Sequence, residues 1–254
     1  EMYTEPGLYA GYIAFNMKDQ LVGRNKALRQ AFAYALSTAD WIDLLHNGRG
    51  LPLNTIVPHP IAGSESDIDF EYYRKDVEMA RKKLAEAGYP NGKGLPVITI
   101  DFRSTTKDTR QSFEFIRNEL AAVDIIVKAN FQTFSAFLTR IESGNFQMAE
   151  AAWGADYPDG ENFYQLLYGP NKKPGPNMSM FDDPEYNRLY EESKFMPNGP
   201  ERYELFTRMS EIMMEKVPLI LRNNRIAFGL YQPRVANMKR NMMVDVPYKY
   251  LNLR

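Results

Sequence analysis

The middle of the chain alternates between strand-like and helix-like segments, and this alternation restricts the fold more than any other feature. Strand-like apolar runs occupy residues 96–102, 123–131 and 145–153. Between them, residues 107–121 and 134–144 have the apolar spacing of amphipathic helices. A β-α-β-α-β order of this kind is typical of α/β proteins, in which right-handed crossovers join adjacent strands. The fold class that we expect is therefore α/β.

Similar patterns continue on both sides of this unit. Apolar residues at helical spacing predict further helices near 25–36, 37–47, 74–90, 183–194 and 200–216. Short apolar runs predict strands at 13–17, 218–224 and 225–231. Ser37 with Asp40 three residues later predicts a helix cap. Residues 51–70 are rich in Pro, Gly, Ser and Asp and should form a loop, while the last twenty residues are mixed and include a candidate strand.

Composition narrows the functions that the chain can have. Lys and Arg number 31 against 32 Asp and Glu, so the chain lacks the basic excess that binds nucleic-acid phosphates. It has no Cys, and its two histidines, His46 and His59, are too few for a His-based metal cluster. No run of eighteen apolar residues could cross a bilayer. We therefore expect no metal, no cofactor and no nucleic-acid partner.

The stretch AAWGADYPDG follows the third strand of the central unit and is the strongest candidate for a binding site. In open α/β sheets, ligands bind beyond the carboxyl ends of the strands. Gly154 lets the backbone come close to a ligand, and Asp156 offers acceptor oxygens for an ammonium or guanidinium group. Trp153 and Tyr157 each provide a flat apolar face with one polar group, at the rim of a site or in the core.

Other roles remain open for the two acidic residues of this stretch. Asp156 could form an Asx turn, and Asp159 could cap the helix that follows. The pair could also be the two carboxylates of a glycosidase, although a spacing of three residues across a proline says little about their separation in space. The chain has no phosphate-binding glycine loop, no Gly-x-Ser-x-Gly and no His-Glu-x-x-His motif. We therefore predict no catalytic residue.

Five blocks of the sequence resemble, in order and with similar gaps, the family 5 extracytoplasmic solute-binding proteins, which are the peptide-type receptors of ABC importers. The blocks are YIAFNM…NKALRQAFAYALSTADWI, ARKKLAEAGYPNG, FLTRIESGNFQMAEAAWGADYPDGENFYQLLYG, NMSMFDDPEYNRLYEES and RYELFTRMSEIMMEKVPLILRNN. The resemblance covers nearly the whole chain. It implies a lobe of the type II periplasmic-binding-protein fold, with a mixed β-sheet flanked by helices.

The resemblance also implies how the chain is organised. Such receptors have two lobes that close on the ligand about a hinge. Residues 1–229 resemble the carboxyl-terminal ligand-binding lobe, and residues 230–254 resemble the tail that returns to the first lobe. The chain is then a fragment that lacks the amino-terminal lobe, which agrees with its start at Glu1, just before an apolar strand-like run.

The resemblance assigns a role to the Trp-x-x-Asp block. In peptide-binding members, the aspartate of this block pairs with the α-ammonium group of the peptide. Trp153, Gly154, Ala155 and Asp156 match the block, so the resemblance implies that Asp156 anchors the ligand. Tyr157 follows directly and is expected at the same rim.

Two positions depart from the family pattern. Glu150 stands where some members have an arginine directed at a ligand carboxylate, and Gly160 stands where proline is common. Arg103 and Arg110, which flank the connection after residues 96–102, are the candidates to hold the ligand carboxylate instead. Glu150 could otherwise be paired structurally by Lys or Arg on a neighbouring strand.

The function that the resemblance implies is the capture of dipeptides or oligopeptides in a cleft between two lobes, without enzymatic activity. The expected partners are a small solute, the amino-terminal lobe and the permease subunits of an ABC transporter. A receptor of the same fold for a nickel chelate, haem, sugar or signalling molecule is the alternative, and a carboxylate-dependent hydrolase or an intracellular interaction module is less favoured. The implied location is the periplasm or the outer face of the cytoplasmic membrane, with a lipid anchor in an upstream segment as one option.

Overall fold

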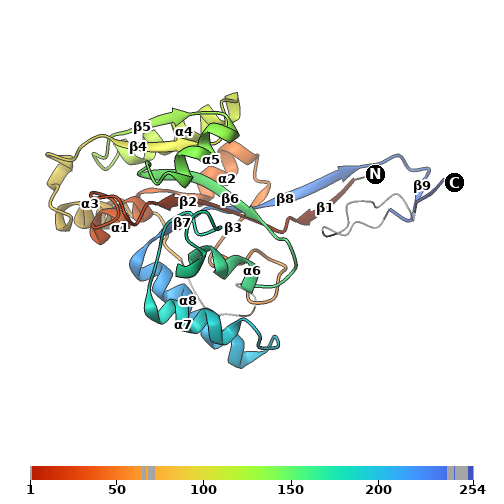
Figure 1. Cartoon of the computed structure of the whole chain (residues 1–254). Coiled ribbons are helices and arrows are strands. Elements are labelled where there is room, and N and C mark those ends of the chain that lie inside the picture. The colour runs from red at the N-terminus through yellow and green to blue at the C-terminus, as the bar shows by residue number, and fades with distance from the viewer. Residues whose placement is uncertain (1, 65–66, 68–71, 239–242, 244–250, 254) are drawn as a thin grey trace.

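A five-stranded mixed sheet forms the centre of the chain, as the computed structural model shows for residues 2–64, 67, 72–238, 243 and 251–253 (Figure 1). The strand order is β5-β4-β6-β2-β7. These strands are β2 Tyr9–Phe15, β4 Ile98–Phe102, β5 Val127–Phe131, β6 Met148–Gly154 and β7 Leu219–Leu221. Strand β4 is parallel to β5 and β6, whereas β2 is antiparallel to β6 and β7. The predicted α/β class and mixed sheet are confirmed.

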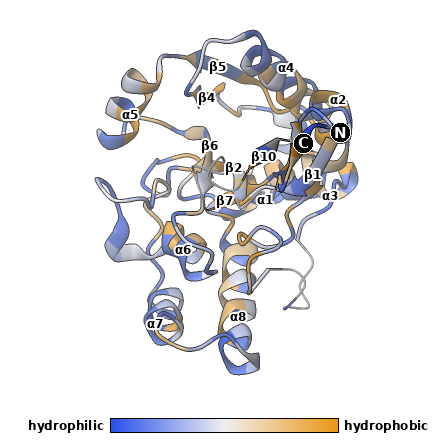
Figure 2. Cartoon of the chain, turned by 90° about the vertical axis from the view of Figure 1, so that its right-hand side faces the viewer, coloured by the Kyte–Doolittle hydropathy of each residue, from blue (hydrophilic) through white to orange (hydrophobic). Residues whose placement is uncertain are grey.

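Helices cover both faces of this sheet because its strands bury side chains on both faces. On β2, Ile13 and Phe15 lie in an apolar core with α1 to α4, whereas Ala10, Tyr12 and Ala14 lie in a second core with α6 to α8. The helices are α1 Lys26–Ala35, α2 Thr38–His46, α3 Val77–Glu86, α4 Lys107–Ala121, α5 Phe134–Glu142, α6 Glu161–Tyr164, α7 Pro184–Ser193 and α8 Pro200–Lys216. Figures 1 and 2 show α2 and α4 above the sheet and α7 and α8 below it.

A second, three-stranded antiparallel sheet adjoins the first through β8 Asn223–Leu230, which begins two residues after β7. Strand β8 lies between β1 Met2–Pro6 and β3 Gly50–Pro52. Figure 1 shows β1 and β8 extending away from the five-stranded sheet. The sequence analysis did not predict β1, and it assigned the last two residues of β3 to a loop. Such short strands carry too few residues for a clear periodic pattern.

The remaining short elements lie in connections and near the carboxyl end. Three 3₁₀ turns are Pro90–Gly92, Gln165–Leu167 and Gly169–Asn171, and β9 Val235–Ala236 pairs with β10 Asn252–Leu253. Strand β10 falls in the candidate strand region of the last twenty residues, of which 239–242, 244–250 and 254 lie outside the described residues. The division into a lobe at 1–229 and a tail at 230–254 stays a prediction.

Local capping explains where the helices begin. The Ser37 hydroxyl accepts a hydrogen bond from the Asp40 backbone N–H at 3.1 Å, so the predicted cap of α2 is confirmed. Asn25, Asp76 and Asp183 cap α1, α3 and α7 in the same way. None of the helices within the described residues has the length and apolar character of a membrane span.

Candidate ligand-binding site

The Trp-x-x-Asp block lies at the carboxyl end of β6, where the sequence analysis placed it. Strand β6 continues through Trp153 and Gly154, with Gly154 opposite Tyr9 on β2. The Ala155 backbone N–H then donates to the Leu8 carbonyl at 2.8 Å, and the chain leaves the sheet. Gly154, Asp156 and Tyr157 are exposed, so this end of the strand is open to a ligand.

Asn162 holds the block in place. Its side chain is fully buried, and its Oδ1 accepts hydrogen bonds from Trp153 Nε1 at 2.9 Å and from the Asp156 backbone N–H at 3.0 Å. Its Nδ2 donates to Asp156 Oδ2 at 3.2 Å. One amide therefore fixes both the indole and the carboxylate, a role that the sequence analysis did not find. The only sequence signal was a short amide side chain in the first turn of the next helix.

The Asp156 carboxylate is exposed, and no Lys or Arg of the described residues lies within ion-pair distance of it. Asn162 engages Oδ2, which leaves Oδ1 for another donor. An oriented carboxylate without a cationic partner is suited to an ammonium or guanidinium group. The Asx turn that the sequence left open for Asp156 is not among the hydrogen bonds of the described residues, because the carboxylate accepts from the Asn162 side chain instead.

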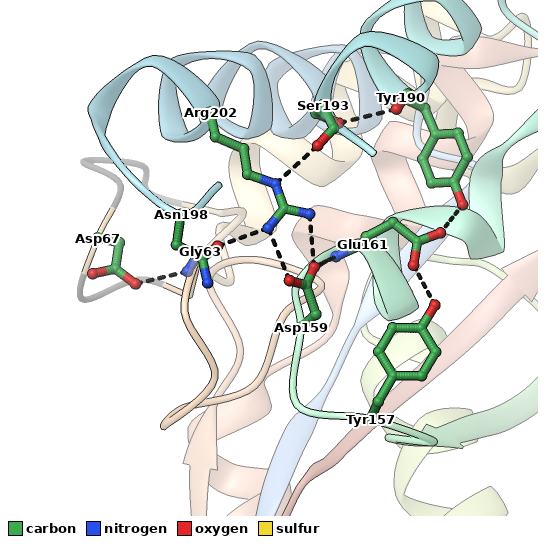
Figure 3. Close-up of polar contacts among 9 residues, drawn as sticks. All are labelled: Gly63, Asp67, Tyr157, Asp159, Glu161, Tyr190, Ser193, Asn198 and Arg202. Carbon is green, nitrogen blue, oxygen red and sulfur yellow. Dashed lines mark hydrogen bonds and ion pairs between the residues drawn. The ribbon is translucent and has the colours of Figure 1, made fainter. Parts of the chain in front are cut away.

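Asp159 has a structural role, because its carboxylate binds both Arg202 and Glu161 (Figure 3). Its Oδ1 accepts a hydrogen bond from the Glu161 backbone N–H at 2.8 Å, so the predicted capping of the next helix is confirmed. Both carboxylate oxygens also bind Arg202 of α8, each at 2.8 Å. Burial alone would raise the pKa of Asp159, but the Arg202 guanidinium and the backbone N–H lower it overall. Sequence reasoning missed this ion pair because its partners are 43 residues apart.

Glu161 fixes the aromatic residue that follows Asp156. Its buried carboxylate accepts hydrogen bonds from the hydroxyl groups of Tyr157 and Tyr190 (Figure 3). Burial raises the pKa of Tyr157, and the Glu161 carboxylate raises it further. The ring of Tyr157 is 44% exposed, so its hydroxyl is tethered while its face stays accessible.

The departure at Gly160 has a packing explanation. A Cβ atom at this position would lie 2.9 Å from Cε2 of Phe206 and 3.0 Å from the Ala62 carbonyl oxygen. The first distance is shorter than real Cβ contacts allow and the second is tighter than most of them, so the absence of a side chain permits the close approach of α8.

Glu150 and Arg103 form a second group, on the opposite face of the sheet. Trp153 packs against the core of α6 to α8, whereas Glu150 lines a cavity of about 490 Å³ between α2, α4 and β8. Arg103 follows β4 and lines the same cavity. Burial raises the pKa of Glu150, and the positive charges of Arg103, Arg222 and Arg225 oppose this shift. These arginines are near enough to affect the pKa of Glu150, but among the described residues none lies within ion-pair distance of its carboxylate.

Arg110 lies elsewhere. Its guanidinium stacks over the ring of Phe131 at 4.6 Å from the ring centroid, and it does not line the cavity that contains Arg103. The structure therefore brings Arg103 and Glu150 together and leaves Arg110 apart, so a ligand role for Arg110 stays a prediction without support from the cavity. In the described residues, no group of three or more His, Asp and Glu side chains could hold a metal ion.

Residues 1–175 match the family model described as bacterial extracellular solute-binding proteins, family 5 middle. The chain belongs to this family. Its members are solute-binding receptors found outside the cytoplasm, which agrees with the resemblance seen in the five sequence blocks.

Individual family 5 proteins are similar over most of the chain. Heme-binding protein A of Haemophilus influenzae is 28% identical over 240 residues, which are 92% of this chain and 43% of that protein. Di/tripeptide-binding protein 1 of Pseudomonas aeruginosa is 26% identical over 218 residues, which are 85% of this chain and 40% of that protein. This chain thus spans less than half the length of either relative.

Solved structures show the same fold. The periplasmic binding protein DppA from Helicobacter pylori, in complex with the peptide STSA, is 25% identical, has a TM-score of 0.84, and is matched over 99% of this chain and 49% of that chain. HbpA2 from Haemophilus parasuis has a TM-score of 0.87 at 23% identity and is matched over 50% of its length. The expected type II periplasmic-binding-protein lobe is therefore confirmed.

Proposed function

We propose that this chain is one lobe of an ABC-importer receptor that captures short peptides between two lobes. The observation that carries the proposal is the exposed Asp156 carboxylate, which Asn162 orients and which no cation of the described residues pairs with. An α-ammonium group can donate to its second oxygen. Two relatives support peptide as the solute class, since one is named a di/tripeptide-binding protein and another was solved with a bound peptide.

The rest of the site gives the ligand an orientation. Trp153 and Tyr157 offer partly exposed aromatic faces on either side of Asp156. Arg103, at the carboxyl end of the neighbouring strand β4, is the candidate for the peptide's terminal carboxylate. The amino-terminal lobe of the same protein would cover the exposed side of the ligand, and permease subunits would receive it. The receptor would act in the periplasm or at the outer face of the cytoplasmic membrane, with a lipid anchor on an upstream segment as one option.

Haem is the second candidate, because one relative is named a heme-binding protein. The two histidines offer little support for haem at Asp156. His46 lines the separate cavity of Glu150, and His59 lies in the loop before the cis bond to Pro60. A haem iron would need an axial His, Cys, Met or Tyr.

Native mass spectrometry of the intact gene product, purified without denaturation, tests the proposal. A heterogeneous set of short peptides bound to the protein is the expected result. A single non-peptide species, such as haem, a metal chelate or a sugar, would contradict it. Turnover of peptides or glycosides by the same preparation would contradict the further expectation that this receptor is not an enzyme.

A further inference from the structure

The cavity of Glu150 carries more positive charge than one ligand carboxylate at Arg103 would neutralise. Its outer part has a volume of about 490 Å³, and a smaller pocket of about 10 Å³ shares Trp41, His46, Glu150 and Arg225 with it. The smaller pocket therefore adjoins the larger cavity. The charged residues that line the two parts are Arg49, Arg103, Arg222, Arg225, Asp108 and Glu150.

Four arginines against two carboxylates leave two excess positive charges in this cavity. This charge affects the pKa of His46. Burial lowers its pKa, and the positive charges of Arg225, Arg222 and Arg49 lower it further. The imidazole is therefore neutral near pH 7 and adds no charge. A cavity with this balance attracts anionic groups.

Arg222 is the member of the group that most needs an acceptor. Its side chain is 3% exposed and its guanidinium stacks on Trp41 at 3.6 Å, yet within the described part of the chain none of its three nitrogens has a hydrogen-bond partner. Burial lowers its pKa to about 9, which leaves it charged near neutral pH. A buried guanidinium without acceptors is strongly unfavourable, so Arg222 is a place where an ordered water or a ligand oxygen would bind.

Arg225 extends this group toward the solvent. It is exposed, lies over the ring of Tyr9 at 5.2 Å, and is not within ion-pair distance of a carboxylate in the described residues. Apolar side chains of Leu45, Ile226 and Phe228 line the outer cavity beside it. A ligand group with methylenes followed by an anion would match this arrangement.

We propose that the cavity binds an acidic side chain of the ligand, so that the preferred solutes are peptides that contain Glu or Asp. This inference rests on the proposed peptide function, in which Asp156 takes the ammonium group and Arg103 the terminal carboxylate. Arg225 and Arg222 then supply the charge for a second carboxylate. Glu150 lies in the same cavity and weakens binding of that carboxylate by repulsion.

Calorimetric titration of the intact gene product with paired tripeptides tests the inference. The two peptides of a pair differ only by Glu or Gln at one position of tri-alanine. Tri-alanine and its C-terminal amide are also compared, because the amide lacks the terminal carboxylate. We expect Glu to bind about 10- to 100-fold more tightly than Gln at one position, the usual range for a charge-assisted hydrogen bond. In Arg225→Gln the Glu and Gln peptides should bind almost equally.

Further variants separate binding from folding. Arg117→Gln is the matched control, because Arg117 lies on the exposed side of α4 and pairs with Glu114. It should keep the preference for Glu. Arg222→Met should weaken the preference without lowering the melting temperature of the ligand-free protein, whereas a merely structural Arg222 would lower it. Glu150→Gln should tighten binding of the Glu peptide and leave the Gln peptide unchanged.

Three outcomes overturn the inference. One is equal binding of Glu and Gln peptides at every position, and another is a Glu preference that survives in Arg225→Gln. The third is a loss of affinity in the arginine variants for tri-alanine itself but not for its amide, which would make the terminal carboxylate the occupant. If Asp156-dependent peptide binding is seen in these cases, the proposed function stands and the acidic-side-chain inference alone fails. If no peptide binds at all, both fail.

Discussion

Replacing Asp156 by asparagine removes the charge from the proposed anchor while preserving its shape. The residue is exposed and makes no ion pair in the described part of the chain, and asparagine can keep its backbone hydrogen bond to Asn162 Oδ1. The fold should therefore be unaffected. Only the carboxylate oxygen that Asn162 does not engage is free for a ligand ammonium group, so the substitution removes one charge-assisted contact.

The size of the effect follows from the burial of that contact when two lobes close. Truncating one partner of a buried, hydrogen-bonded charge pair costs about 2–5 kcal/mol. This range corresponds to a loss of about 30- to 4,000-fold in affinity for a peptide with a free amino terminus. The loss of affinity caused by Asp156→Asn should fall within this range, because the ammonium group would then be buried without an opposite charge.

Isothermal titration calorimetry of the intact gene product provides the assay. Wild type and Asp156→Asn are compared with one peptide and with its N-acetylated form, which has no ammonium group. Asp183→Asn serves as the control, because Asp183 caps α7 and lies outside the site. Equal affinities of wild type and Asp156→Asn for the free peptide would refute the assignment, and so would an equal loss for the acetylated peptide.

The remaining predictions concern the residues that support the block. Asp159→Ala should lower the free energy of unfolding by about 3–5 kcal/mol, since it leaves the 2%-exposed Arg202 without its carboxylate. Arg202→Met should lower it by only about 1–3 kcal/mol, because the side chain of Asp159 is 29% exposed and water can reach it. Urea denaturation distinguishes the two, and equal losses would contradict the asymmetry. The pKa of Asp159 is lower in the folded state, so its stabilising contribution is present above its unfolded pKa and is lost as the pH falls through the folded pKa. The free energy of unfolding of wild type should therefore fall more steeply below about pH 4 than that of Arg202→Met. Parallel curves of stability against pH would count against the ion pair. Gly160→Ala should destabilise the protein by about 1–3 kcal/mol through its clash with Phe206, and an unchanged melting temperature would show that α8 can move away. Asn162→Ala should weaken peptide binding, and in a double-mutant cycle its loss and that of Asp156→Asn should not add, because the two side chains contact each other. Additive losses would argue against the orientation of Asp156 by Asn162.

Much of the fold could be predicted because its signals are local. Strand and helix patterns over 96–153 depend on residues a few positions apart, and the Ser37 cap acts on an N–H three residues away. The same holds for Asp159, whose capping bond reaches only two residues along the chain. The short strands β1 and β3 were not predicted, because their pairing with β8 depends on a strand more than 170 residues away.

The sequence by itself determined the α/β class, the family and the position of Asp156 at a strand end, because each of these depends on neighbours along the chain or on a linear motif. Only the tertiary structure decided the surroundings of that residue. Chain topology brings Asn162 under Asp156 and Arg202 against Asp159. The alternation of β6 places Glu150 on the face opposite Trp153, in a cavity with an arginine, Arg222, that stacks on Trp41. Charge and burial act through space, so no local pattern could reveal these groups.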